Sequence, residues 1–175
     1  MNRRAVHVFR PATDILNYEF SYNPEETAFL KRSMKSRASV SIDDLRRIAL
    51  WKLDRVLNVP AATRVLLASI SSAKDIKEDA SLSKKAITSL VACEGVGYPM
   101  ASAFLKFLRP DVFPIIDVRA YRALTGKSLR YDQYTLALYL AYVRKIREIA
   151  MATGRPFSQV DEQLYCFDKE RNGAI

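Results

Sequence analysis

A turn with two glycines, and an aspartate twenty positions after it, are the residues of this sequence best suited to chemistry. Gly95 and Gly97, with Val96 between them, permit a tight turn and leave backbone N–H groups uncovered at the start of the next helix. The dipole of that helix favours an anion, so the turn can hold one backbone phosphate of a nucleic acid without recognising a base. An ordinary turn between core helices would have the same residues, and Gly-Val-Gly alone does not separate the two alternatives.

Asp117 follows the apolar run 113–116 and precedes a helical segment. Some hydrolytic reactions build positive charge on the substrate in the transition state. A carboxylate about 4 Å away would contribute on the order of 4 kcal/mol at an effective dielectric constant of about 20. The same carboxylate can orient or deprotonate the attacking water, and the helix N-terminus would keep it ionised at neutral pH. The alternative is that Asp117 only caps its helix, as aspartate commonly does.

The elements that must position these residues are all predicted to be helices. Apolar residues recur at helical spacing, while Asn, Ser or Asp marks several helix starts and Gly or Pro several helix ends. Ser158 and Asp161 have the spacing of a capping box at the start of the last helix. The expected helices cover residues 23–35, 41–56, 61–70, 73–78, 83–91, 99–108, 117–126, 131–153 and 158–169. No two segments alternate as paired strands would, so the predicted fold class is all-α.

The composition indicates one soluble globular unit, residues 1–175, with a polyanionic partner. The formal net charge is +9, the isoelectric point is about 9.7, and 49% of the residues are hydrophobic, which is enough for a core. No stretch approaches the roughly 20 apolar residues of a membrane span, and residues 1–10 lack the pattern of a signal peptide. We therefore expect a cytoplasmic, nucleoid-associated protein that does not enter a membrane.

The cysteine and histidine counts exclude several chemistries. Cys93 and Cys166 are the only cysteines and His7 is the only histidine, so the chain cannot supply the ligands of an iron–sulfur cluster or of a cysteine- or histidine-rich zinc site. A serine or cysteine nucleophile would need His7, which lies far from any suitable motif. We expect no metal site, and we expect both cysteines to be reduced, buried thiols.

The hairpin and the aspartate together resemble the helix-hairpin-helix superfamily of base-excision DNA glycosylases. The segment 90–103 is similar to the family pattern Leu-x-x-Leu-Pro-Gly-Val-Gly-x-x-x-Ala, and the segment 113–117 is similar to the Phe-Pro-Ile-aliphatic-Asp of its adenine-specific members. The separation of Gly97 from Asp117 also matches. The resemblance covers about residues 83–125 and is closest to members without an iron–sulfur cluster. It implies a bilobal helical fold, with one lobe at about 40–125 and the other formed by 1–39 plus 126–175.

What the resemblance implies for function is hydrolysis of the N-glycosidic bond of a damaged, mismatched or modified base in DNA, as in base-excision repair. Asp117 would be the catalytic residue. The turn residues Gly95, Val96 and Gly97, together with Arg119, would bind DNA phosphate. No cofactor is expected, and a monovalent cation at the hairpin turn is the one ion that the resemblance leaves open.

The sequence departs from the family pattern at two positions. Glu94 replaces the usual proline before the first glycine and brings a negative charge to the proposed phosphate site. Pro99 occupies the position at which bifunctional relatives carry the lysine that forms a Schiff base. The expected reaction is therefore simple hydrolysis to an abasic site, without cleavage of the strand.

A flipped base would need a pocket between the lobes, and aromatic residues are the candidates to stack on it. We name Trp51, Lys52, Tyr98 and Tyr121 as base-pocket candidates, although each aromatic could equally belong to the core and each cation to a solvated helix face. Two other functions fit the same sequence. One is a non-catalytic nucleic-acid-binding module that keeps only the scaffold, and the other is a helical structural domain that binds no DNA.

Overall fold

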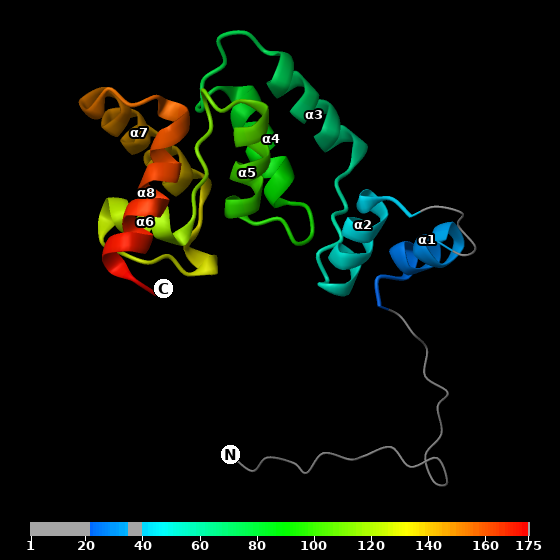
Figure 1. Cartoon of the computed structure of the whole chain (residues 1–175). Coiled ribbons are helices and arrows are strands. Elements are labelled where there is room, and N and C mark those ends of the chain that lie inside the picture. Colours follow the sequence, from blue (N-terminus) through cyan, green and yellow to red (C-terminus); the bar gives the residue numbers. More distant parts are fainter. Residues whose placement is uncertain (1–21, 35–39, 175) are drawn as a thin grey trace. The chain divides into compact units, whose positions relative to one another are not determined.

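The computed structural model describes residues 22–34 and 40–174, and His7 lies outside them. The described residues form helices and no strand, which confirms the all-α class. The helices are α1 (Pro24–Met34), α2 (Ile42–Lys52), α3 (Ala61–Ser72), α4 (Ser81–Val91), α5 (Tyr98–Leu108), α6 (Val118–Thr125), the short 3₁₀ helix η1 (Tyr131–Gln133), α7 (Leu136–Thr153) and α8 (Phe157–Asn172) (Figure 1). None of the helices in this part of the chain has the length and apolar character needed to cross a membrane.

The chain divides by its internal contacts into two units, residues 1–56 and 57–175. The first holds α1 and α2, and the second holds α3 to α8 together with η1. The predicted lobe boundary near residue 125 falls inside the second unit, between α6 and η1. The predicted lobes 40–125 and 1–39 plus 126–175 stay a prediction.

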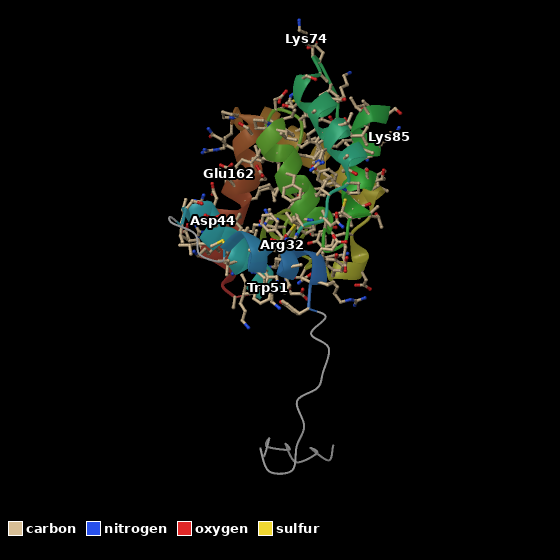
Figure 2. The ribbon with its side chains drawn as sticks, turned by 90° about the vertical axis from the view of Figure 1, so that its right-hand side faces the viewer. Arg32, Asp44, Trp51, Lys74, Lys85 and Glu162 are labelled. Carbon is tan, nitrogen blue, oxygen red and sulfur yellow. The ribbon has the colours of Figure 1, made fainter. Side chains whose placement is uncertain are left out.

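The first unit is a pair of helices held by polar contacts. Ser41 and Asp44 form a capping box at the start of α2, as the Ser-x-x-Asp spacing indicates. The indole N–H of Trp51 donates to Thr27 Oγ1 of α1 at 2.8 Å, and the Tyr22 ring packs edge-on against the indole. Trp51 (labelled in Figure 2) therefore serves the contact between α1 and α2.

The second unit has one hydrophobic core to which α3–α8 all contribute. Its largest fully buried side chains include Tyr139, Tyr142, Phe113, Leu90 and Ile116. Helix α3 packs on α4 and α5, α4 packs on α7, and α8 contacts both α6 and α7. Figure 1 shows α8 running beside α6. The core thus surrounds the connection from α5 to α6, which ends at Asp117.

Four of the predicted elements differ in the structure. Helix α2 ends at Lys52 and not at residue 56. Residues 73–78 form turns and no helix, with Asp75 at a φ of +50°. The long helix begins at Leu136 and not at residue 131, because Thr135 is extended and caps it by accepting from Leu138 N at 3.1 Å. The last helix begins at Phe157 after Pro156 without a side-chain cap, so the predicted capping box of Ser158 and Asp161 is wrong.

Asp168, an acidic residue of α8, pairs with two arginines of α6 that also contact the C-terminal residues. Asp168 is fully buried and accepts from Arg122 at 2.8 and 2.9 Å and from Arg119 at 3.2 Å. The same guanidinium groups donate to the carbonyls of Gly173 and Ala174. Because the hydrogen bonds from Arg122 favour the charged form, the pKa of Asp168 lies well below its usual 3.8.

Candidate active site

The hairpin turn lies between α4 and α5 and is closed by an apolar residue. Gly95 has a φ of +74°, which disfavours residues with a Cβ, and it is exposed to solvent. Val96 is 2% exposed and packs into the core, as expected for the residue that holds the two helices together. Cys93 is buried below the turn, with its thiol donating to Ser89 O. Cys166 is exposed, so the expectation of two buried thiols is wrong for this cysteine.

Gly97 is required for a different reason from Gly95. Its φ is −88°, so it does not adopt the left-handed conformation that Gly95 uses. A Cβ at this position would lie 2.8 Å from Cε2 of Tyr131. The Tyr131 ring therefore rests against the turn, although 75% of this residue is exposed. No side chain caps the first N–H groups of α5, which follow Gly97. This leaves the start of α5 suited to an anion.

The phosphate role of the turn predicts that Gly95→Ala weakens DNA binding by about 3- to 10-fold, the effect of one hydrogen bond to a phosphate. The variant should also lose about 1 kcal/mol of stability, because alanine is strained at positive φ. Gly126→Ala is the matched control, since Gly126 has a φ of +71° and open space where the Cβ would stand, as Gly95 does. Fluorescence anisotropy with a labelled duplex and urea unfolding measure the two effects. Equal DNA affinity in the two variants would refute the phosphate role.

Asp117 stands immediately before α6 as its N-cap. Its backbone is extended, with φ −125° and ψ 171°, and its Oδ1 accepts from Ala120 N at 2.7 Å. Burial raises the pKa of Asp117 above its usual 3.8, and the nearby charge of Asp161 raises it further. The N–H groups of Ala120 and Arg119 lower the pKa in the predicted direction, but burial outweighs them. The capping alternative is thus realised, and the carboxyl is in addition partly desolvated.

Buried side chains hold the segment before Asp117 through four consecutive backbone groups. The carbonyl of Pro114 accepts from Tyr139 Oη at 3.0 Å, and the carbonyl of Ile115 accepts from Tyr142 Oη at 2.9 Å. The N–H of Ile115 donates to Asp161 Oδ2 at 2.8 Å, and the N–H of Ile116 donates to Ser102 Oγ at 3.1 Å. Helices α5, α7 and α8 therefore fix the position from which Asp117 projects.

Two tyrosines, Tyr134 and Tyr142, lie near enough to Asp117 for its charge to affect their pKa values. Burial raises the pKa of Tyr134 and of Tyr142, and the charge of Asp117 adds to both effects. The rings of Tyr121 and Tyr142 lie 6.4 Å apart between centroids. The Tyr134 hydroxyl is buried and has no hydrogen-bond partner among the residues that the structure describes. The sequence alone does not single out Tyr134 or Tyr142, because nothing in their spacing along the chain points to Asp117.

The orphaned hydroxyl predicts that Tyr134→Phe leaves stability unchanged or raises it by about 1 kcal/mol, because the substitution removes an unsatisfied buried polar group. Tyr142→Phe is the matched control. It deletes a hydroxyl that donates to Ile115 O, so it should cost about 1 kcal/mol. Urea unfolding of both variants at neutral pH measures the difference. A loss in Tyr134→Phe as large as that in Tyr142→Phe would contradict the prediction.

The other predicted site residues are engaged in different ways. Arg119 pairs with Asp168 and Gly173 O, so its guanidinium already has partners. Tyr98 and Tyr121 pack against the core, and burial raises the pKa of Tyr98. Trp51 and Lys52 belong to the first unit and Asp117 to the second. The structure therefore brings Asp117 together with Tyr121 and the hairpin in one unit, and leaves the pocket roles of Trp51 and Lys52 as predictions.

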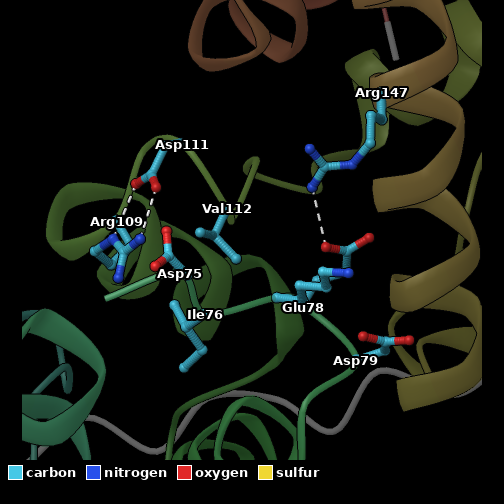
Figure 3. Close-up of a pocket in the computed structure, with 9 residues that line it drawn as sticks. Asp75, Ile76, Glu78, Asp79, Arg109, Asp111, Val112 and Arg147 are labelled. Carbon is cyan, nitrogen blue, oxygen red and sulfur yellow. Dashed lines mark hydrogen bonds and ion pairs between the residues drawn. The ribbon is translucent and has the colours of Figure 1, made fainter. Parts of the chain in front are cut away.

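A separate pocket of about 440 Å³ lies at the other end of the α5–α6 connection (Figure 3). Its two arginines are paired, Arg109 with Asp111 at 2.7 Å and Arg147 with Glu78 at 3.0 Å. It is lined by Asp75, Ile76, Lys77, Glu78, Asp79, Arg109, Asp111, Val112 and Arg147. None of these is a predicted site residue, and their charges nearly cancel. We assign no ligand to this pocket.

Comparison with known proteins adds no family assignment: no family model, no curated protein and no solved structure matches the chain. The candidate site therefore rests on its own geometry. That geometry consists of a helical hairpin with an uncapped helix start and a partly buried carboxyl at the next helix N-terminus.

Proposed function

We propose that this protein is a monofunctional DNA glycosylase that hydrolyses the N-glycosidic bond of a damaged, mismatched or modified base. The observation that carries the proposal is the environment of the Asp117 carboxyl. This carboxyl is partly desolvated, it is oriented by Ala120 N, and the segment before it is pinned by buried side chains. A residue that only capped α6 would not need its charge buried, since a solvated aspartate caps equally well.

In the proposed reaction the bond between the sugar C1′ and the base nitrogen breaks, and its electron pair leaves with the base. The ionised Asp117 stabilises the positive charge that develops on the sugar, and it orients the water whose oxygen then bonds to C1′. The water loses one proton, and the departing base gains one. The products are a free base and an abasic site. Because Pro99 stands where bifunctional members of the resembled family carry a lysine, no imine forms at that position and the strand stays intact.

DNA binding in this proposal uses the hairpin as a phosphate clamp. The backbone N–H groups at Gly95, at Gly97 and at the start of α5 would donate hydrogen bonds to one backbone phosphate. The net charge of +9 supplies the long-range attraction to DNA. Binding should therefore weaken steeply as salt is raised.

The test is a panel of end-labelled duplexes, each with one damaged, mismatched or modified base, incubated with protein in excess. Abasic product is scored by strand cleavage in hot alkali, and a sample without alkali shows whether the protein itself cuts the strand. The proposal expects cleavage of at least one duplex in the alkali-treated sample only. Tight binding of the duplexes without any abasic product would refute the glycosylase activity.

One observation favours the second candidate, a non-catalytic DNA-binding module. Arg119 and Arg122 are the basic side chains of α6, next to Asp117, and both are engaged by Asp168 and the C-terminal carbonyls. Glu94 also adds negative charge beside the turn. This candidate predicts salt-sensitive DNA binding with no abasic product. The third candidate, a structural helical domain, predicts no binding even at low salt.

A further inference from the structure

A buried ion pair joins α5 to α8 beside the segment that leads into Asp117. Lys106 and Asp161 are 5% and 3% exposed, and Lys106 Nζ lies 2.5 Å from Asp161 Oδ1. The ammonium also donates to Ser158 O at 2.7 Å and lies 3.0 Å from a carboxylate oxygen of Glu162. Its donors are thus satisfied, which an ammonium at this depth requires.

The second oxygen of Asp161 leads to Asp117. Asp161 Oδ2 accepts from the N–H of Ile115 at 2.8 Å, so the carboxylate bridges the lysine and the connecting segment. A hydrogen bond to an ionised acceptor is shorter and stronger than one between neutral groups. Lys106 lies against the other oxygen of this carboxylate and so orients it for the bond to Ile115, which lies two residues before Asp117.

Stability alone does not account for such a pair. Burying two charges costs several kcal/mol in desolvation, and a well-packed hydrophobic pair often stabilises a protein as much or more. The specific consequence here is geometric, because the bridge fixes the direction in which the segment 114–116 enters α6. Displacement of a catalytic group by about 1 Å can cost on the order of 100-fold in rate.

We propose that Asp161, held by Lys106, is a positioning residue that sets the place of the Asp117 carboxyl through the backbone of Ile115. The proposal rests on the glycosylase function for its kinetic consequence. Its structural consequence, a fixed Ile115 backbone and a maintained Asp117 cap, does not depend on that function.

The test uses the full chain with two single variants and their combination. In Asp161→Asn an NH₂ group replaces one of the two carboxylate oxygens, so the side chain can no longer accept from Lys106 and Ile115 at the two separate positions used in the wild type. Lys106→Met leaves the buried carboxylate without its counter-charge. The double variant removes both charges together, and Asn at 161 keeps an oxygen that can accept from Ile115 N. If a single variant fails to fold, the double variant still carries the test.

We expect each single variant to lower the single-turnover rate of base release by about 10- to 100-fold, with DNA affinity unchanged. The double variant should recover most of that rate. Ile70→Ala is the control, since it opens a cavity in the same core at α3 and Ile70 makes none of the hydrogen bonds of the bridge. A rate in the folded single variants equal to that of the wild type, or no recovery in the double variant, would overturn the positioning role.

Amide hydrogen exchange gives the readout that is independent of activity. The N–H groups of Ile115 and Ala120 donate to Asp161 and Asp117, so both should exchange faster in the single variants than global unfolding accounts for. Ile70→Ala should change them only through global stability. If the wild type releases no base, the proposed function fails and the exchange rates alone decide. If Ile115 and Ala120 keep global protection in every variant, the positioning role fails whatever the activity.

Discussion

Asp117→Asn should lower the single-turnover rate of base release by about 10³-fold while leaving the protein as stable as the wild type. The rate loss follows from the removal of a negative charge that contributes on the order of 4 kcal/mol to a developing sugar cation, at about 1.4 kcal/mol per tenfold. Asparagine caps a helix about as well as aspartate does, so the bond from Ala120 N is kept.

The stability of this variant separates a functional residue from a structural cap. Burial raises the pKa of Asp117, so the ionised form is less favoured in the folded chain than in the unfolded chain. Above the unfolded pKa of about 3.8, the ionised carboxyl therefore costs stability, and removal of its charge should leave the free energy of unfolding at neutral pH equal or higher. Lower activity combined with equal or higher stability is the pattern of a site that sacrifices stability for function.

The raised pKa of Asp117 also predicts how the rate of base release changes at acid pH. Activity requires the ionised carboxyl, so the rate should fall as the pH drops through a pKa above 3.8, and this acid limb should be absent from the residual activity of Asp117→Asn. Thr135→Ala is the matched control, because Thr135 caps α7 by accepting from Leu138 N. It should cost about 1 kcal/mol of stability and leave the rate unchanged. Wild-type activity in Asp117→Asn would mean that Asp117 acts only as the N-cap of α6.

Local patterns in the sequence predicted much of what places Asp117. The helix starts and ends follow from capping residues and glycines, as at Ser41, Asp117 and Gly126. The burial of Val96 follows from its place between two helices that must pack together. These features depend on residues within a few positions of one another, and such contacts are what spacing along the chain can reveal.

The residues behind Asp117 could not be predicted in this way. Ser158 and Asp161 have the spacing of a capping box, yet Asp161 turns inward to Lys106, 55 positions earlier, and to Ile115, 46 positions earlier. Tyr131 likewise rests on Gly97 from an element that was expected to be continuous with α7. Such partners are set by how the helices pack, and a single sequence carries no signal that pairs them.

Asp168→Asn should strongly destabilise the second unit, lowering Tm by about 10 °C. The variant leaves Arg119 and Arg122 without their shared carboxylate and frees the contacts that join α6 to α8. Asp111→Asn is the matched control, since Asp111 also makes a two-bond pair with an arginine but is exposed. An exposed pair contributes little, so Tm should change by no more than about 2 °C in the control.

The lowered pKa of Asp168 also predicts the direction in which the stability of the protein changes with pH. Because the pKa of Asp168 is lowered in the folded chain, its contribution is fully present above the unfolded value of 3.8 and is lost as the pH falls below it. Wild-type stability measured by thermal unfolding should therefore decline from pH 5 to pH 3, and Asp168→Asn should show a shallower decline. Equal slopes in the two proteins would assign acid sensitivity to other carboxylates. Asp168 also pairs with Arg119 of α6, the helix that Asp117 caps. A shallower decline of stability in Asp168→Asn would therefore also mean that the contact between α6 and α8 weakens in acid.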